Sequence, residues 1–265
     1  MNPPSVAQAI RAALLTGDPY EKVKAARKLA RDWRAGRLAF GFDVAMPDDP
    51  ARPDRPELLP PNKMPKRGRG QSAAGLIALY HALAHIEFVA IDLALDMAGR
   101  FGAEGGKTLV DDFLSVAAEE AMHFVLLDRR LRALGSCYGT LPAHGGLWDA
   151  ATSTRGDLAA RLAIVPMVLE ARGLDVTPMT LERLRMAGDS GGVRILSRIL
   201  DDEIRHVRFG ASHFDAVCRQ RRLDPETTWK SLLKNHFRGR PKPPFNDSAR
   251  QSAGLSRTFY AEVDC

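Results

Sequence analysis

Two Glu-x-x-His motifs are the clearest sign of chemistry in this sequence. Glu120-Ala-Met-His123 and Glu203-Ile-Arg-His206 are its only occurrences. Chance pairing of the 11 Glu and 7 His residues supplies about 0.3 such motifs. Residues three positions apart share one face of a helix, so each motif presents a carboxylate and an imidazole to one point. This combination predicts a metal site with oxygen and nitrogen ligands.

Two further glutamates precede the motifs at equal spacing. Glu87 lies 33 residues before Glu120, and Glu170 lies 33 residues before Glu203. At about 1.5 Å per residue, a helical hairpin brings Glu87 and Glu120 to one level. The second pair fits this geometry less neatly, because Pro178 lies between its members.

Charge balance favours two divalent metal ions. Four carboxylates buried in a protein interior without partners would be very unfavourable, whereas two divalent cations balance them. Oxygen-rich ligation with one imidazole per ion is typical of iron or manganese, so we expect two iron ions, with manganese or a mixed pair as alternatives. A bundle with buried ion pairs and no metal is the structural alternative. The predicted ligands are Glu87, Glu120, His123, Glu170, Glu203 and His206.

An acid stands directly before the glutamate of each motif. Glu119 lies four residues before His123, and Asp202 lies four residues before His206. A metal-bound histidine usually donates its other ring N–H to a carboxylate, which fixes the tautomer. We therefore hypothesise that Glu119 and Asp202 accept these hydrogen bonds. Two acids that face solvent are the alternative.

Three other polar residues precede Glu87. At about 100° per residue, His81 and His85 lie away from the Glu87 side of a helix, so we expect a buried hydrogen-bonded or surface role for them. Tyr80 is seven residues before Glu87 and lies about 10 Å along the same stripe. It is a candidate redox-active tyrosine, and a core residue with a satisfied hydroxyl is the alternative.

Helical periodicity predicts the elements that position these residues. Predicted helices cover 72–99, 109–134, 157–173 and 193–222, with a glycine-rich turn at 102–106. Thr177-Pro178 is expected to interrupt the pattern before a short helix at 181–187. No strand pattern appears. Two hairpins joined by a longer connection at 136–154 indicate an all-α protein, a four-helix bundle with one long crossover as in ferritin-like folds.

Segments outside the predicted bundle are also helical or extended. Residues 1–35 are predicted to form two helices, the first beginning at Ser5, with an interruption at Gly17-Asp18-Pro19. The proline-rich segment 47–65 is expected to be an extended strap. A fifth helix is predicted at 225–237. We therefore expect N-terminal helices and strap at 1–70, the metal-binding bundle at 71–225, and a C-terminal helix with a basic tail at 226–265.

Composition indicates a soluble protein. The chain is 45% hydrophobic and 26% charged, and no uninterrupted apolar run approaches the roughly 20 residues of a membrane span. No secretory signal is evident at the N-terminus. Cys137, Cys218 and Cys265 are few and scattered, which favours a reducing cytoplasm and excludes a disulfide framework. No Cys-x-x-Cys pair is present, so a built-in rubredoxin-type iron site is excluded.

Basic residues cluster in two stretches, 63–69 and 230–242, in a chain of net charge +6. Such stretches can meet an anionic partner such as RNA. A solvated basic surface is the simpler interpretation, because no stacking pattern or nucleic-acid motif accompanies them.

Four sequence blocks resemble a known family. HALAHIEFVAIDLALD, AAEEAMHF, LEARGLD and ILDDEIRHVRFG resemble, over about residues 70–225, a bacterial ferritin-like family catalogued as the domain of unknown function numbered four-fifty-five. ARPDRPELLPPNKMPKR resembles the N-terminal region of that family. More distantly, the pattern is similar to di-iron enzymes that include tRNA-modifying hydroxylases, rubrerythrins and bacterial monooxygenases. This resemblance places the six predicted ligands on metal-ligand positions.

The ligand set and the resemblance together suggest an oxidoreductase. A di-iron centre would activate dioxygen or peroxide to hydroxylate or oxidise an organic substrate. Electrons would come from a separate donor, because the chain carries no rubredoxin or flavin motif. Two alternatives stay open: a ferroxidase, iron-storage or peroxide-scavenging protein, and an RNA-binding or tRNA-modifying protein that uses the basic surface.

Overall fold

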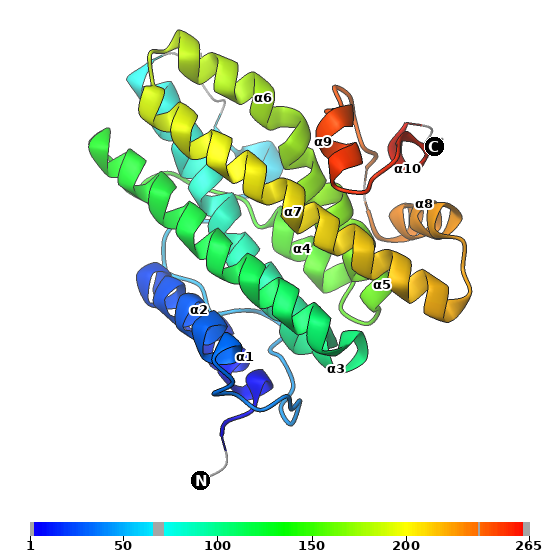
Figure 1. Ribbon diagram of the computed structural model, residues 1–265. Helices are drawn as coiled ribbons and strands as arrows, with labels where there is room; N and C mark the ends of the chain where they lie inside the picture. Colours follow the sequence, from blue (N-terminus) through cyan, green and yellow to red (C-terminus); the bar gives the residue numbers. More distant parts are fainter. Residues whose placement is uncertain (1–2, 66–71, 238, 262–265) are drawn as a thin grey trace. The chain divides into compact units, whose positions relative to one another are not determined.

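The computed structural model describes residues 3–65, 72–237 and 239–261. The chain forms two compact units, Met1–Trp148 and Asp149–Cys265, which are described separately below. Every secondary-structure element assigned in the described ranges is a helix, so the all-α prediction is confirmed (Figure 1).

Two short helices open the first unit. Helix α1 (Val6–Leu14) begins after Ser5, which forms a capping box with Gln8. Helix α2 (Pro19–Arg34) begins after Asp18, whose carboxylate accepts hydrogen bonds from the first backbone N–H groups. The predicted start at Ser5 is confirmed, and so is an interruption near Gly17-Asp18-Pro19, although Pro19 itself is the first residue of α2. Both helices pack against α3 (Figure 1).

Helix α3 (Ala73–Ala133) is a hairpin whose two arms meet at Gly106. Gly106 has a φ of 78°, a conformation that favours glycine. The prediction that the first helix ends at residue 99 was wrong, since the helix continues through Gly99, Gly102 and Gly105. A Cβ at Gly102 would lie 2.4 Å from the ring of Phe42, so this glycine permits close packing inside a helix. The second arm ends at Ala133, as predicted to within one residue.

The proline-rich segment is extended, as predicted. Its only helical piece among the described residues is a 3-10 turn, η1 (Pro61–Lys63). The backbone N–H of Leu59 donates to Ala143 and that of Ala143 donates to Glu57, at 2.8 and 2.9 Å. The N–H of Ala51 donates to the carbonyl of Leu14. The strap is therefore tied to α1 and to the connection that follows α3.

The connection at 136–154 contains a helix that the sequence analysis missed, α4 (Gly146–Ser153). The second unit continues with α5 (Leu158–Ile164), a π-helix labelled η2 (Val165–Glu170), and α6 (Ala171–Met186). Helix α7 (Ser190–Arg221) packs along all three. The chain closes with α8 (Pro225–His236), α9 (Asp247–Ser252) and α10 (Arg257–Tyr260).

The predicted interruption at Thr177-Pro178 was wrong, because Pro178 lies inside α6. A proline inside a helix leaves the carbonyl four residues earlier without its helical donor. That carbonyl belongs to Leu174, and the side-chain amide of Asn246 donates to it at 3.2 Å. A distant residue therefore compensates for the proline, which the local pattern could not show.

Pro166 coincides with a change of helix type in the second unit. The proline lies in η2, where the hydrogen bonding changes from α to π. The carbonyl of Ala163, just before this segment, accepts a hydrogen bond from the indole N–H of Trp229 at 3.2 Å. The π-helix ends at Glu170, one of the predicted ligands.

Helix α3 is long and apolar enough to cross a membrane by composition. Most of its apolar window is nevertheless buried inside the protein, which is typical of the core helix of a soluble protein.

Candidate metal centre

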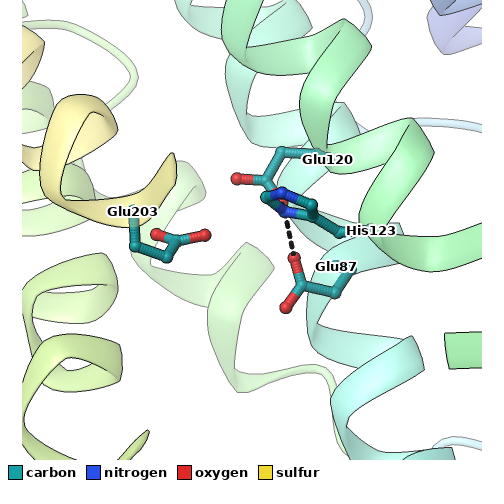
Figure 2. Close-up of side chains that lie close together, drawn as sticks. All are labelled: Glu87, Glu120, His123 and Glu203. Carbon is teal, nitrogen blue, oxygen red and sulfur yellow. Dashed lines mark hydrogen bonds and ion pairs between the residues drawn. The ribbon is translucent and has the colours of Figure 1, made fainter. Parts of the chain in front are cut away.

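Three of the predicted ligands meet inside the first unit. Glu87 comes from the first arm of α3, while Glu120 and His123 come from the second. The Nδ1 atom of His123 lies 3.3 Å from an oxygen of Glu87 and 3.3 Å from an oxygen of Glu120. One ligand atom from each residue lies within 4.8 Å of the others, so the group could hold a metal ion. Figure 2 draws these three side chains together with Glu203 of the second unit.

The three side chains are deeply buried. Relative exposure is 6% for Glu87, 1% for Glu120 and 0% for His123. Burial raises the pKa of Glu87 well above its usual range, and the neighbouring Glu120 carboxylate raises it further. His123 opposes this shift only in part. Two close carboxylates in such a setting favour a positive charge between them.

Other buried carboxylates of this unit are neutralised differently. Asp92 lies 2.6 Å from Nζ of Lys22 and 3.3 Å from the guanidinium of Arg52. Asp128 pairs with Arg132 at 2.8 Å. Glu87 interacts instead with a second carboxylate and an imidazole. The donor set around Glu87 therefore suits a metal cation, with Nδ1 as the histidine atom that faces the carboxylates.

The remaining predicted ligands belong to the second unit. Glu203 and His206 lie one turn apart on α7 and are both buried. The Nδ1 atom of His206 lies 3.6 Å from an oxygen of Glu203. Glu170 is the last residue of η2 and is partly exposed. Within the described part of this unit, the three residues do not form a group whose ligand atoms all lie within 4.8 Å of one another.

Of the two acids that precede the motifs, Asp202 forms ion pairs with arginines. Asp202 pairs with Arg205 at 3.1 Å and with Arg198 at 3.6 Å, both on its own helix. Glu119 is half-buried on α3. A role for either carboxylate as acceptor from a metal-bound histidine stays a prediction.

Of the two roles predicted for His81 and His85, buried and hydrogen-bonded or at the surface, the structure shows the first. Nε2 of His81 accepts from the backbone N–H of Gly139 at 3.0 Å, and burial lowers the pKa of His81. Nδ1 of His85 lies 2.9 Å from the hydroxyl of Tyr138. Burial lowers the pKa of His85 to about 4, so this imidazole is neutral at physiological pH.

Tyr138, which the sequence did not single out, packs against residues that neighbour two of the ligands in the chain. Its ring centroid is 5.6 Å from that of Phe88 and 5.1 Å from that of Phe124. These two phenylalanines follow Glu87 and His123 directly in the chain. Tyr138 sits in a connection without periodicity, so no sequence signal could place it there. Tyr80 is fully buried, and its redox role stays a prediction.

The basic stretches are only partly described. Of the first, residues 66–69 lie outside the described residues, as does residue 238 of the second. Cys265 also lies outside the described residues, whereas Cys137 and Cys218 are free thiols.

Comparison with known proteins supplies the family. The sequence pattern of the family described as "Protein of unknown function (DUF455)" matches residues 15–261. The chain belongs to this family. A relative from Haemophilus influenzae, described as an uncharacterized protein, is 38% identical over 261 residues, which covers 94% of this chain and 90% of the relative. No solved structure matches the chain significantly. DUF455 membership thus confirms the family resemblance and assigns no reaction.

Proposed function

We propose that this DUF455 protein is a ferritin-like di-iron carboxylate protein of the cytoplasm that oxidises an organic substrate. The observation that carries the proposal is the buried group of Glu87, Glu120 and His123 in the first unit. A Glu from one helix and a Glu-x-x-His pair from the next is half of the ligand set used by ferritin-like di-metal proteins. Glu170, Glu203 and His206 repeat the same residue types and spacing in the second unit.

The complete centre in this proposal joins the two halves in one four-helix bundle. Each half contributes two carboxylates and one imidazole, so the six side chains carry four negative charges. Two divalent ions balance these charges, and the oxygen-rich set suits iron, with manganese as the alternative. When bound, the metal pair would supply the redox chemistry that activates dioxygen or peroxide.

His123 contributes to the site in two ways. His123 presents Nδ1 to the carboxylates, and its burial at 0% exposure keeps solvent from the ligand atoms. Phe88 and Phe124, which follow Glu87 and His123 in the chain, pack against each other and against Tyr138. The sequence holds no motif for a bound electron carrier, so a separate donor protein would provide the electrons.

The test is iron loading followed by exposure to oxygen. Anaerobically loaded wild-type protein should show a change in the near-ultraviolet spectrum when O₂ is admitted. His123→Ala and His206→Ala should each lose this change, whereas His213→Ala, a control on α7, should retain it. Iron that binds without reacting with O₂ would contradict the oxidase proposal. A very large cage on gel filtration would favour iron storage, and strong salt-sensitive tRNA binding would favour an RNA-modifying role.

A further inference from the structure

A cavity of about 180 Å³ lies within the second unit, apart from the predicted ligands. One side is formed by the end of η2 and the start of α6, through Val168, Leu169 and Arg172. The opposite side is formed by the segment that follows α8, which contributes Phe237, Arg240, Pro241 and Lys242. A cavity below the roughly 300 Å³ of ordinary ligand pockets suits a small molecule.

The charge of the cavity lining is positive. Arg172, Arg240, Lys242 and Arg250 line it, and Asp175 is the only acid among the described lining residues. Both carboxylate oxygens of Asp175 are already engaged, because the guanidinium of Arg250 donates to them at 2.8 and 2.7 Å. The backbone N–H of Asn246 donates to the same carboxylate at 3.0 Å. The Asp175 charge is therefore neutralised within the protein.

Arg250 is held as a structural residue. Its guanidinium lies 5.1 Å from the ring centroid of Phe245 and 4.4 Å from that of Tyr260. The residue is 2% exposed. The Arg250–Asp175 pair thus fixes the C-terminal segment on α6 and shapes one side of the cavity.

Arg172 is placed to bind a ligand. Its Nη1 donates to the carbonyl of Lys242 at 2.6 Å and lies 3.6 Å from Asp175. Its contacts within the described ranges all involve Nη1. The Nε–Nη2 edge of a guanidinium can bind a carboxylate or phosphate through two parallel hydrogen bonds. That edge is available for such a ligand.

We propose that this cavity binds a small organic anion. Arg172, Arg240 and Lys242 would hold its carboxylate or phosphate group. Val168, Leu169, Phe237 and Pro241 would contact a short apolar body. The site lies within one unit and does not depend on the proposed metal centre. Because Leu169 directly precedes Glu170, a bound anion would lie beside the segment that carries a predicted metal ligand.

Calorimetric titration of the full-length protein with three probes tests this inference. Phenylacetate and phenyl phosphate carry the two candidate anionic groups on one apolar body, and inorganic phosphate lacks that body. We expect saturable binding at about one site per chain for at least one phenyl compound, with the tighter of the two identifying the anionic group. Phenyl phosphate should bind tighter than inorganic phosphate. Equal affinity for these two would overturn the role of the apolar wall.

Two double variants locate the binding. Arg240→Gln with Lys242→Gln should weaken the affinity by about tenfold or more, since hydrogen bonds to charged groups are lost. Arg183→Gln with Lys234→Gln removes the same charge elsewhere in this unit and should change the affinity less than about twofold. If both double variants weaken the affinity equally, the proposed site is overturned. It is also overturned if the wild-type protein shows no saturable binding at 10 mM probe, which is roughly the limit of specific binding.

Anion binding by the Glu120→Ala variant distinguishes a failure of the cavity proposal from a failure of the proposed function. The variant removes a predicted metal ligand of the first unit, so binding that persists in it belongs to the cavity. Binding that disappears with Glu120 would reflect anion binding to a metal and would overturn the cavity proposal.

Discussion

Glu87 and Asp92 lie five residues apart on the first arm of α3, and both are buried. Asp92 receives Lys22 from α2 and Arg52 from the strap, so the fold supplies its counter-charge. Glu87 meets Glu120 and His123 from the second arm. Burial raises the pKa of both acids, but Lys22 and Arg52 oppose the rise at Asp92, whereas Glu120 adds to the rise at Glu87. Burial alone therefore does not identify a functional acid. The charges of its neighbours show whether a buried carboxylate stabilises the fold through an ion pair or is suited to bind a cation.

The Asp92 network should give the largest effect on stability. Asp92→Ala leaves Lys22 buried without its anion, and breaking such a pair costs about 3–5 kcal/mol. Urea denaturation of the metal-free protein would measure the change. Asp32→Ala removes an acid that pairs with the exposed Lys28 and Arg37, and it should destabilise the protein far less than Asp92→Ala does. If the two variants lower the free energy of unfolding equally, the distinction between the buried and the exposed ion pairs is wrong.

His85 should give the next largest effect, and only at acidic pH. Burial lowers its pKa to about 4 from the usual 6.5, so the folded state binds fewer protons than the unfolded state between these two pH values. Its contribution to stability is present above pH 6.5 and is lost as the pH falls toward 4, by about 3 kcal/mol. Denaturation of metal-free wild type and His85→Gln from pH 7 to 4 checks this. The variant should lose less stability, and parallel curves would refute the assignment.

Glu87→Gln should give the smallest effect, with the opposite sign to Asp92→Ala. The substitution removes one of two close carboxylates, so the metal-free protein should become more stable at pH 7 by about 1 kcal/mol. Because the pKa of Glu87 is raised, its unfavourable contribution grows as the pH rises above the unfolded value. The gain should therefore increase from pH 5 to 8. If Glu87→Gln instead destabilises the metal-free protein, then Glu87 stabilises the fold as Asp92 does, and the comparison fails.

Motif spacing predicted the meeting of Glu87, Glu120 and His123, because helical hairpin geometry is regular. The sequence likewise predicted the helix start at Ser5, whereas it placed Asp18, the residue that caps α2, in an interruption. Compensation from distant residues could not be predicted. The amide of Asn246 keeps α6 continuous past Pro178, and the side chain of Phe42 packs where a glycine turn was expected.

The sequence indicates the acids around Asp92 but not their partners. Asp92 and Asp96 stand four residues apart in an apolar helix, which signals buried acids. Their partners arise from tertiary contacts: Lys22 comes from a helix 70 residues earlier, and Arg52 from a segment without periodicity. The cavity beside η2 was hidden for the same reason, since its two sides are about 70 residues apart in the chain.

Metal stoichiometry tests the central claim most directly. Full-length protein would be loaded with Fe²⁺ without oxygen, desalted, and analysed for iron and protein. The account predicts about two ions per chain for wild type and for the exposed control Glu182→Ala, with marked loss in Glu87→Ala. Fewer than about one ion per wild-type chain, or unchanged iron in Glu87→Ala, would contradict it.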